Sequence, residues 1–398
     1  MTRRGHSPFF LIILLITQPL LAQTQDDKLT LLEQKLDELL RQATEIRQEI
    51  DKLKGAQPED LTKVETVETS QPAPPPQLTD VQTIDNQIAP GASKVFNPDT
   101  SVIGNFVGRT GQTNPFEERQ PLSLEEAEVA FEAFVDPYMK AKFFIAVGPE
   151  GAEVEEGYAN LLTLPYDLTA KVGKMKMTFG KDNTWHTHVR PWVDQPLVIH
   201  NFFGDEGLND SGISVSKSFQ NNVAFVEGTG EVFNGGGDGN DLFYNGHLKA
   251  FKDLTENSNV EVGTSYARGA HNRFGGVDVT YRWKPLQQSL YHSFIGRFEG
   301  IVDDRAGLDR TLKGFYASAD YQLARRWFTG VRLDRADRGS DPRHVTDRGA
   351  SATLTFWPSE FSQFRAQLRR ISYGGAKSVT ELLLGMQFSI GAHGAHTF

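Results

Sequence analysis

The sequence has no cysteine among its 398 residues. This absence excludes a disulfide-stabilised scaffold, a thiolate metal site and an N-terminus anchored through a lipidated cysteine. It also lacks any internal run of the about 18–20 apolar residues that a membrane-spanning helix needs, so a helical membrane protein is excluded. Positive charge is in deficit, and a net charge of −10 argues against nucleic acid as a partner.

Glycine and aromatic residues are plentiful, with 37 Gly, 27 Phe and 10 Tyr. Hydrophobic residues make up only 38% of the chain. A transmembrane β-barrel is compatible with such a hydrophilic average, because only every second residue of each strand faces lipid. The length alone permits either two or three soluble domains or one large barrel.

The N-terminal residues 1–22 are typical of a secretory signal peptide. Arg3 and Arg4 form the charged start, the apolar segment follows from Phe9 to Ile16, and Ala22 is the small residue before cleavage. The alternative, a short membrane anchor, would need a longer apolar segment.

Residues 28–54 carry a heptad pattern that predicts an amphipathic helix. The narrow apolar stripe has to pair with another helix, so we expect a coiled coil formed with copies of itself, against a solvated helix or one docked on another protein. Residues 55–95 are rich in proline and polar side chains, and they are predicted to be a flexible linker. The stripe consists of Leu29, Leu32, Leu36, Leu39, Ala43, Ile46, Ile50 and Leu53.

Residues 96–398 consist of about sixteen short runs in which apolar and polar residues alternate, each long enough for a tilted strand to cross a bilayer. Tight connections between the runs alternate with longer ones, which is typical of outer-membrane barrels. We therefore predict an all-β fold, a transmembrane antiparallel β-barrel of about 16 strands. A soluble sandwich has the same alternation with its faces inverted, but the signal peptide and the connections favour the barrel.

In the final stretch, residues 378–398, the side chains alternate from Thr380 to Ile390, and the stretch ends on an aromatic residue, Phe398. It resembles the closing strand of bacterial outer-membrane barrels. The resemblance implies that the barrel assembly machinery recognises Phe398 and that the protein contacts outer-membrane lipid.

Residues 154–183 resemble the phosphate-selective porins of the O/P type and their relatives. In that family an acidic residue precedes an aromatic, a tight Pro-containing turn follows, and a glycine- and lysine-containing strand leads into a long loop. The corresponding strand here is Gly173–Gly180. Thr178 stands where the family has proline, and there is no dense lysine ladder, so the resemblance implies the porin fold and a homotrimer rather than phosphate selectivity.

Residues 181–210 form the third outer loop, and the likeness to general porins implies that this loop folds into the lumen and sets its constriction. Its cationic groups could bind anions and its rings could stack on planar solutes. The alternative, which we favour for the aromatic residues, is that they fasten the loop to the barrel wall. The candidate constriction residues are Trp185, His186, His188, Arg190, Trp192 and His200.

Charged residues in the alternating runs are expected to face the lumen. Acidic and basic residues on neighbouring strands predict a transverse electric field across the pore. The candidate pore-lining residues are Glu126, Glu128, Glu132, Lys140, Lys142, Lys174, Lys176, Arg282, Arg332, Arg365 and Arg369.

The pair His186 and His188, together with His200, could in principle bind zinc or copper. The sequence fixes no acidic residue as a further ligand, so we predict no metal and no other cofactor. It also shows no nucleophile–base arrangement, phosphate loop or metallohydrolase spacing, so we do not expect an enzyme.

The sequence as a whole predicts a porin of the bacterial outer membrane, with its coiled coil in the periplasm. Small hydrophilic solutes or ions would diffuse through its water-filled barrel. One alternative is a barrel-anchored structural tether whose coiled coil reaches the cell wall. A less favoured alternative is an outer-membrane hydrolase.

Overall fold

The chain divides into two compact units, Met1–Asn86 and Gln87–Phe398. The expected signal peptide, coiled coil, linker and terminal Phe398 lie outside the described residues, apart from Arg41, which is helical and exposed. Within the described part of the chain, no helix has the length and apolar character needed to cross a membrane. The computed structural model describes residue 41 and residues 98–112, 115–116, 119–149, 151–221, 223–235, 241–339 and 344–391.

Strands dominate the second unit, and most are long enough to cross a bilayer when tilted. Their bounds are β1 Asp99–Gly111, β2 Leu122–Asp136, β3 Met139–Gly148, β4 Gly151–Leu164, β5 Leu168–Lys176, β6 Asn209–Gln220, β7 Phe225–Asn234, β8 Leu242–Thr255, β9 Ser258–Arg268, β10 Asn272–Trp283, β11 Phe294–Arg305, β12 Leu312–Ala324, β13 Trp327–Asp337, β14 Thr346–Ser359, β15 Ser362–Ser372 and β16 Ser378–Gly391. The helical elements are α2 Leu197–Phe203 and the 3-10 turns Pro165–Asp167, Asp182–Thr184, Thr187–Val189 and Leu286–Gln288.

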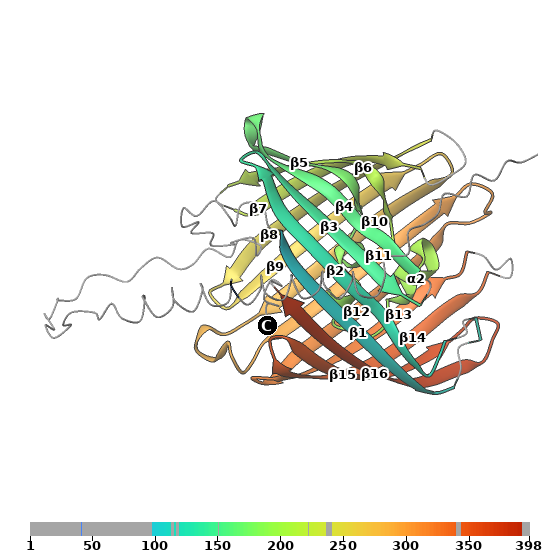
Figure 1. Ribbon diagram of the computed structural model, residues 1–398. Helices are drawn as coiled ribbons and strands as arrows, with labels where there is room; N and C mark the ends of the chain where they lie inside the picture. Colours follow the sequence, from blue (N-terminus) through green and yellow to red (C-terminus); the bar gives the residue numbers. More distant parts are fainter. Residues whose placement is uncertain are drawn as a thin grey trace, which may run out of the picture. The chain divides into compact units, whose positions relative to one another are not determined.

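The strands form a closed barrel in which each strand pairs with its neighbours in sequence. β1 closes the ring on β16, with Val102 opposite Ile390, and every pair is antiparallel. Figure 1 shows the strands running obliquely across the wall. Closure satisfies the backbone hydrogen bonds of every strand and leaves no free edge. The prediction of an antiparallel 16-strand barrel is confirmed.

The two faces of the wall differ as the alternation predicts. On β13, Val331 and Leu333 are 55% and 59% exposed, whereas Arg332 between them is 2% exposed. The same period of two places Leu354 outside and Thr353 inside on β14. The exposed face is therefore a belt of aliphatic and aromatic side chains far larger than the apolar patches of soluble proteins.

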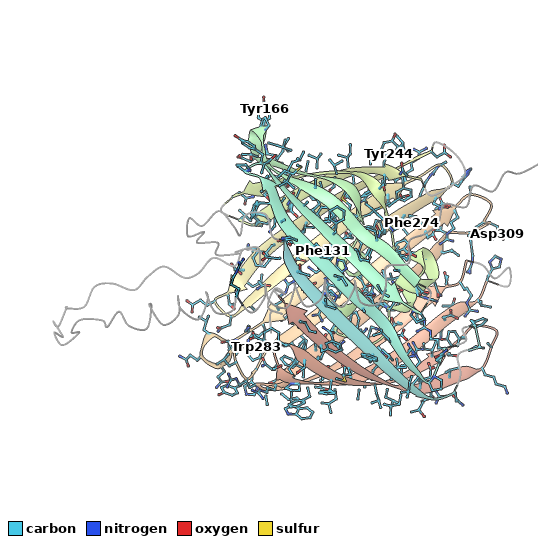
Figure 2. The ribbon with its side chains drawn as sticks, in the orientation of Figure 1. Phe131, Tyr166, Tyr244, Phe274, Trp283 and Asp309 are labelled. Carbon is cyan, nitrogen blue, oxygen red and sulfur yellow. The ribbon has the colours of Figure 1, made fainter. Side chains whose placement is uncertain are left out.

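The two ends of the barrel carry different connections. Tyr166, in the tight turn between β4 and β5, lies at the opposite end from Asp309, in the longer connection between β11 and β12 (Figure 2). The connection between β10 and β11 lies at the short-turn end but is longer, spanning residues 284–293. There Lys284 N–H donates to the Asn257 carbonyl, and Leu286 N–H donates to the Asn257 side chain, so the neighbouring turn holds this segment in place.

Candidate functional site

The segment between β5 and β6, residues 177–208, leaves the wall and is called the inner loop below. β5 ends at Lys176, so the strand predicted from residues 173–180 is cut short. Thr178 donates its N–H and its hydroxyl to the Glu231 carboxylate at 2.9 and 2.8 Å. Gly180 has φ +60°, and a Cβ there would collide with the Glu299 carboxylate. The left-handed backbone and the lack of space for a Cβ both favour glycine where the chain turns inward.

The inner loop lies inside the barrel, because it contacts side chains from strands all around the closed ring. It meets β2 and β4 through His186, β9 through Lys181, and β15 through Asp194. No segment outside a closed barrel could reach all of these walls. The wall residues that receive the loop are Glu128, Glu156, Glu231, Glu261, Glu299, Asp334, Gln367 and Arg369.

Apolar packing holds the middle and end of the inner loop. Trp192 is 2% exposed and meets Tyr316 edge to face at 5.3 Å between ring centroids. The Phe179 ring packs against Phe203 and Phe274 in the same geometry. The short helix α2 packs against β12 and β13 (Figure 1). Buried aromatic pairs of this kind fix orientation as well as contributing burial.

Asp194 is the main charged contact of the inner loop. Its carboxylate accepts hydrogen bonds from Arg332 at 3.0 Å and from Arg369 at 2.8 Å. Gln367 donates to the same carboxylate and also accepts the Val193 N–H. The two guanidinium groups hold the pKa of Asp194 well below its usual range, although burial acts in the opposite direction. Removing one partner would leave uncompensated charge in the interior.

The candidate residues Arg190 and Arg365 meet at the loop backbone. Arg365 donates to the Arg190 carbonyl at 2.8 Å and to the Trp192 carbonyl at 3.1 Å. The Arg190 side chain in turn donates to Asp182 at 3.1 Å. Arg332 also lies over the Trp192 ring, 4.8 Å from its centroid. Arg332 and Arg365 therefore serve as wall contacts of the loop, whereas Arg190 pairs within the loop.

His186 and His188 are brought to a cluster of carboxylates on β2 and β4. His186 Nδ1 lies 3.0 Å from both Glu128 and Glu155, and Nε2 lies 3.1 Å from Glu156. His188 Nδ1 lies 3.5 Å from the same Glu128 oxygen. The three carboxylates raise the pKa of His186 well above its ordinary value, against the opposing effect of its burial. The imidazolium is therefore the favoured form of His186 without other ligands.

The other two loop candidates lie elsewhere. His200, on α2, has its own partner in Asp205 at 2.9 Å and does not join the other two histidines. Trp185 lies beside Trp192, at 6.4 Å between centroids, and Arg297 stands over its ring at 5.6 Å. The structure therefore splits the expected histidine trio into a pair and a single residue.

Lysines near the short-turn end pair with acids on their own side of the barrel. Lys140 and Lys142 both contact Glu132, the latter at 2.8 Å. Arg282 lies 3.6 Å from Glu261. Because these charges are neighbours, they neutralise one another locally instead of forming the field expected between the acids of β2 and the lysines of β3.

Lys174 is placed differently from the expectation. It stands opposite Gly157 and Ser211, two residues beyond the outward pair Val172 and Ile213, so it belongs to the outer face. Its ammonium donates to the Val154 carbonyl at 2.7 Å. Lys176, two residues further on, is at the end of the strand and reaches Glu155 at 2.7 Å. A strict two-residue period fails here because β5 ends.

Charge of opposite sign lies on opposite sides of the interior, on residues other than those expected. Glu231 on β7 stands across the ring of strands from Arg369 on β15. Glu261 adds to the acidic side, and Arg332 and Arg365 add to the basic side. The inner loop lies between the two walls and binds both.

Several residues of the site were not anticipated from the sequence. No sequence motif marks Asp194, because its partners lie on strands that are distant in the chain, β13 and β15. Glu155 and Glu156 are consecutive, so strand alternation would place them on opposite faces. A register shift between Phe144 and Ile145 makes Glu155 a β-bulge residue, and both carboxylates then reach His186. The available signal in the sequence was the pair of consecutive acidic residues shortly before the aromatic residue Tyr158.

A closed sixteen-stranded antiparallel barrel with a loop folded into its lumen has the architecture of outer-membrane porins. Solved structures agree at the level of fold. They include an anion-selective porin from Comamonas acidovorans (TM-score 0.53, 10% identity, covering 73% of this chain and 98% of that one). A second is OmpT, an outer membrane protein of Vibrio cholerae, with a TM-score of 0.52 and 8% identity, covering 74% of this chain and 97% of that one. A third is OprB of Pseudomonas putida, with a TM-score of 0.51 and 12% identity, covering 74% of this chain and 94% of that one.

Sequence comparison finds one relative and no matching family model. No known protein-family model matches the chain. An uncharacterized protein from Aquifex aeolicus (strain VF5) is 28% identical over 389 residues, which covers 78% of this chain and 82% of that protein. The similarity extends over most of both chains.

Proposed function

We propose that this protein is an outer-membrane porin that lets small hydrophilic solutes or ions diffuse passively through its barrel. The observation that carries the proposal is the loop that crosses the inside of a closed barrel with an apolar outer belt. Such a wall suits lipid on one side and water on the other. The inner loop would narrow the passage, and the charges around it would select solutes by size and field.

The outer surface supports placement in a bilayer. Aromatic side chains gather toward the two ends of the strands, such as Tyr138 and Phe361 near the short turns and Tyr244 and Tyr266 near the longer connections. Aliphatic residues such as Val331 fill the belt between them. Interfacial aromatic girdles are characteristic of membrane barrels. We place the short turns on the periplasmic side.

The proposal includes an assembly and two partners. A Vibrio cholerae OmpT structure with a TM-score of 0.51 is titled as a trimer form, and we propose that this chain is also a homotrimer. Phe398 would be the signal for the barrel assembly machinery. The coiled coil of residues 28–54 would then lie in the periplasm and join the protomers, or reach the cell wall.

Swelling of reconstituted liposomes tests the proposal. Vesicles containing the refolded protein are diluted into iso-osmotic sugars of increasing size, and uptake is followed by light scattering. We expect rapid swelling with the smallest sugars and a sharp decline as sugar size rises. Vesicles without protein are the control. Absence of swelling with every sugar would contradict a porin and favour the tether, while lipid or peptide hydrolysis by the same preparation would favour an enzyme.

A further inference from the structure

We propose that the protein binds one divalent transition-metal ion of the zinc class where the inner loop meets β2 and β4. The ligands would come from His186 and His188 on the loop and from Glu126, Glu128 and Glu155 on the wall. This site is independent of the transport function, since a barrel that passes no solute could still bind the ion.

The geometry provides two overlapping ligand sets. The donor atoms of Glu126, Glu128 and His188 lie within 4.8 Å of one another, and so do those of Glu128, Glu155 and His186. Glu128 belongs to both sets and therefore lies at the centre. Zinc lies about 2.1 Å from each ligand atom of a tetrahedral site, so its ligand atoms are about 3.4 Å apart. Small side-chain rotations would bring either set to that spacing.

The rings are already directed toward the carboxylates. His186 directly precedes the 3-10 turn Thr187–Val189, which contains His188, and both imidazoles face β2. Phe144 packs on the His186 ring at 4.7 Å between centroids, and the two imidazoles stack at 5.7 Å. Ligands held by packing lose little conformational entropy on binding an ion.

Hydrogen bonding alone serves this cluster poorly. His186 Nδ1 faces oxygens of both Glu128 and Glu155, although one ring nitrogen carries at most one proton. His188 shares the Glu128 oxygen that His186 already faces. A metal ion can accept several oxygen and nitrogen donors at once, which a single proton cannot do.

The excess negative charge of this cluster also favours binding of a cation. Glu126, Glu128, Glu155 and Glu156 bring four carboxylates together, and the Lys176 ammonium pairs with Glu155 at 2.7 Å. With His186 as the imidazolium, two negative charges remain in excess, and a divalent ion that takes the place of its proton would reduce that excess to one. Glu128 is 1% exposed, so uncompensated charge there is costly. Imidazole donors favour zinc, copper or nickel over magnesium and calcium.

Calorimetric titration of zinc chloride into the chelator-treated, folded full-length protein in detergent tests the proposal. We expect saturable binding of one ion per chain. His188→Ala and Glu128→Gln should each weaken binding at least about 30-fold, because each removes a ligand. His200→Ala is the matched control, since this histidine is on the same loop but pairs with Asp205. It should bind as the unchanged protein does.

A second control removes the histidines of the C-terminal sequence, with His393→Ala and His396→Ala together. Binding should persist there. The proposal would be overturned if the unchanged protein showed no saturable zinc binding. It would also be overturned if His188→Ala and Glu128→Gln bound zinc as tightly as the unchanged protein does. A closed barrel should migrate faster on SDS gels before boiling than after it, and this difference is the check that each variant is folded.

If both ligand variants fail to fold, the unchanged protein still decides the matter. Bound Co²⁺ should give visible absorption, and zinc should displace it, because both ions occupy the same nitrogen and oxygen donors. Affinity should also fall as the pH is lowered, since protons compete for the imidazoles. A Co²⁺ signal that zinc leaves unchanged, or binding insensitive to pH, would overturn the proposal.

Discussion

At the scale of single residues, buried charge governs how the inner loop is seated. Asp194 receives two guanidinium groups and an amide from β13 and β15. At a different part of the wall, His186 lies among carboxylates of β2 and β4. The loop is therefore held by a negative group beside the arginines of β13 and β15 and by a positive group beside the carboxylates of β2 and β4.

The substitution Asp194→Asn should loosen the loop without opening the barrel. Arg332 and Arg369 would lose their shared counter-ion, and breaking a buried pair costs about 3 kcal/mol or more. We expect amide hydrogen exchange across residues 177–208 to become about 100-fold faster or more, while strand amides keep their protection. Asp205→Asn, at an exposed position on the same loop, is the control. Unchanged exchange in the Asp194 variant would refute this role.

In metal-free protein, His186 makes the attachment of the inner loop to the barrel wall depend on pH. The groups facing it are Glu128, Glu155 and Glu156 on the wall and His188 on the loop. Its pKa is raised on folding, so its contribution is fully present below the ordinary value of 6.5 and is lost as pH rises through the higher folded value.

In the presence of a chelator, open-channel current noise should therefore increase at alkaline pH. The variant His186→Gln, which has no imidazolium to lose, should be noisy at both pH values and show little change between them. Equal noise in the unchanged protein at neutral and alkaline pH would show that this histidine does not hold the loop.

At the scale of elements, the early end of β5 creates the inner loop. Thr178 turns toward Glu231, Gly180 adopts a left-handed conformation, and the chain reaches Trp192 deep in the interior. The aromatic contacts then fix the part of the loop that precedes α2.

Trp192→Ala should release this part of the loop. Removing a buried Trp side chain costs about 3–5 kcal/mol, and the loss falls on loop packing and not on the strand ladder. We expect greater current noise with an unchanged heat-dependent shift on SDS gels. Trp327→Ala, which removes an outward Trp from β13, is the matched control and should conduct quietly. Quiet conduction by the Trp192 variant would argue against loop fastening.

The sequence predicts the elements better than their contacts. Alternation gave the strands and their faces, since burial on one side imposes a period of two on residues such as Arg332 and Val331. It could not show that β5 ends at Lys176, because the residues beyond it continue the same pattern. The bulge at Glu155 and the partners of Asp194 depend on register and on strands far apart in the chain, which local patterns do not encode.

At the scale of the whole barrel, closure leaves no strand edge unpaired. Each strand has hydrogen-bonded neighbours on both sides, including the pair β1 and β16. The folded protein should therefore resist SDS at room temperature and migrate faster than the boiled form. Electrophoresis of heated and unheated samples measures this directly, and identical migration of the two would contradict a closed barrel.

Single-channel conductance in planar bilayers tests the central claim, a channel narrowed by the inner loop, most directly. The unchanged protein is compared with a variant in which residues 186–203 are replaced by a short Gly–Ser linker, with a similar replacement in the connection at residues 306–311 as control. We predict discrete conductance steps for all three, larger only when the inner loop is shortened. No steps from the unchanged protein, or equal steps in all three, would contradict the account.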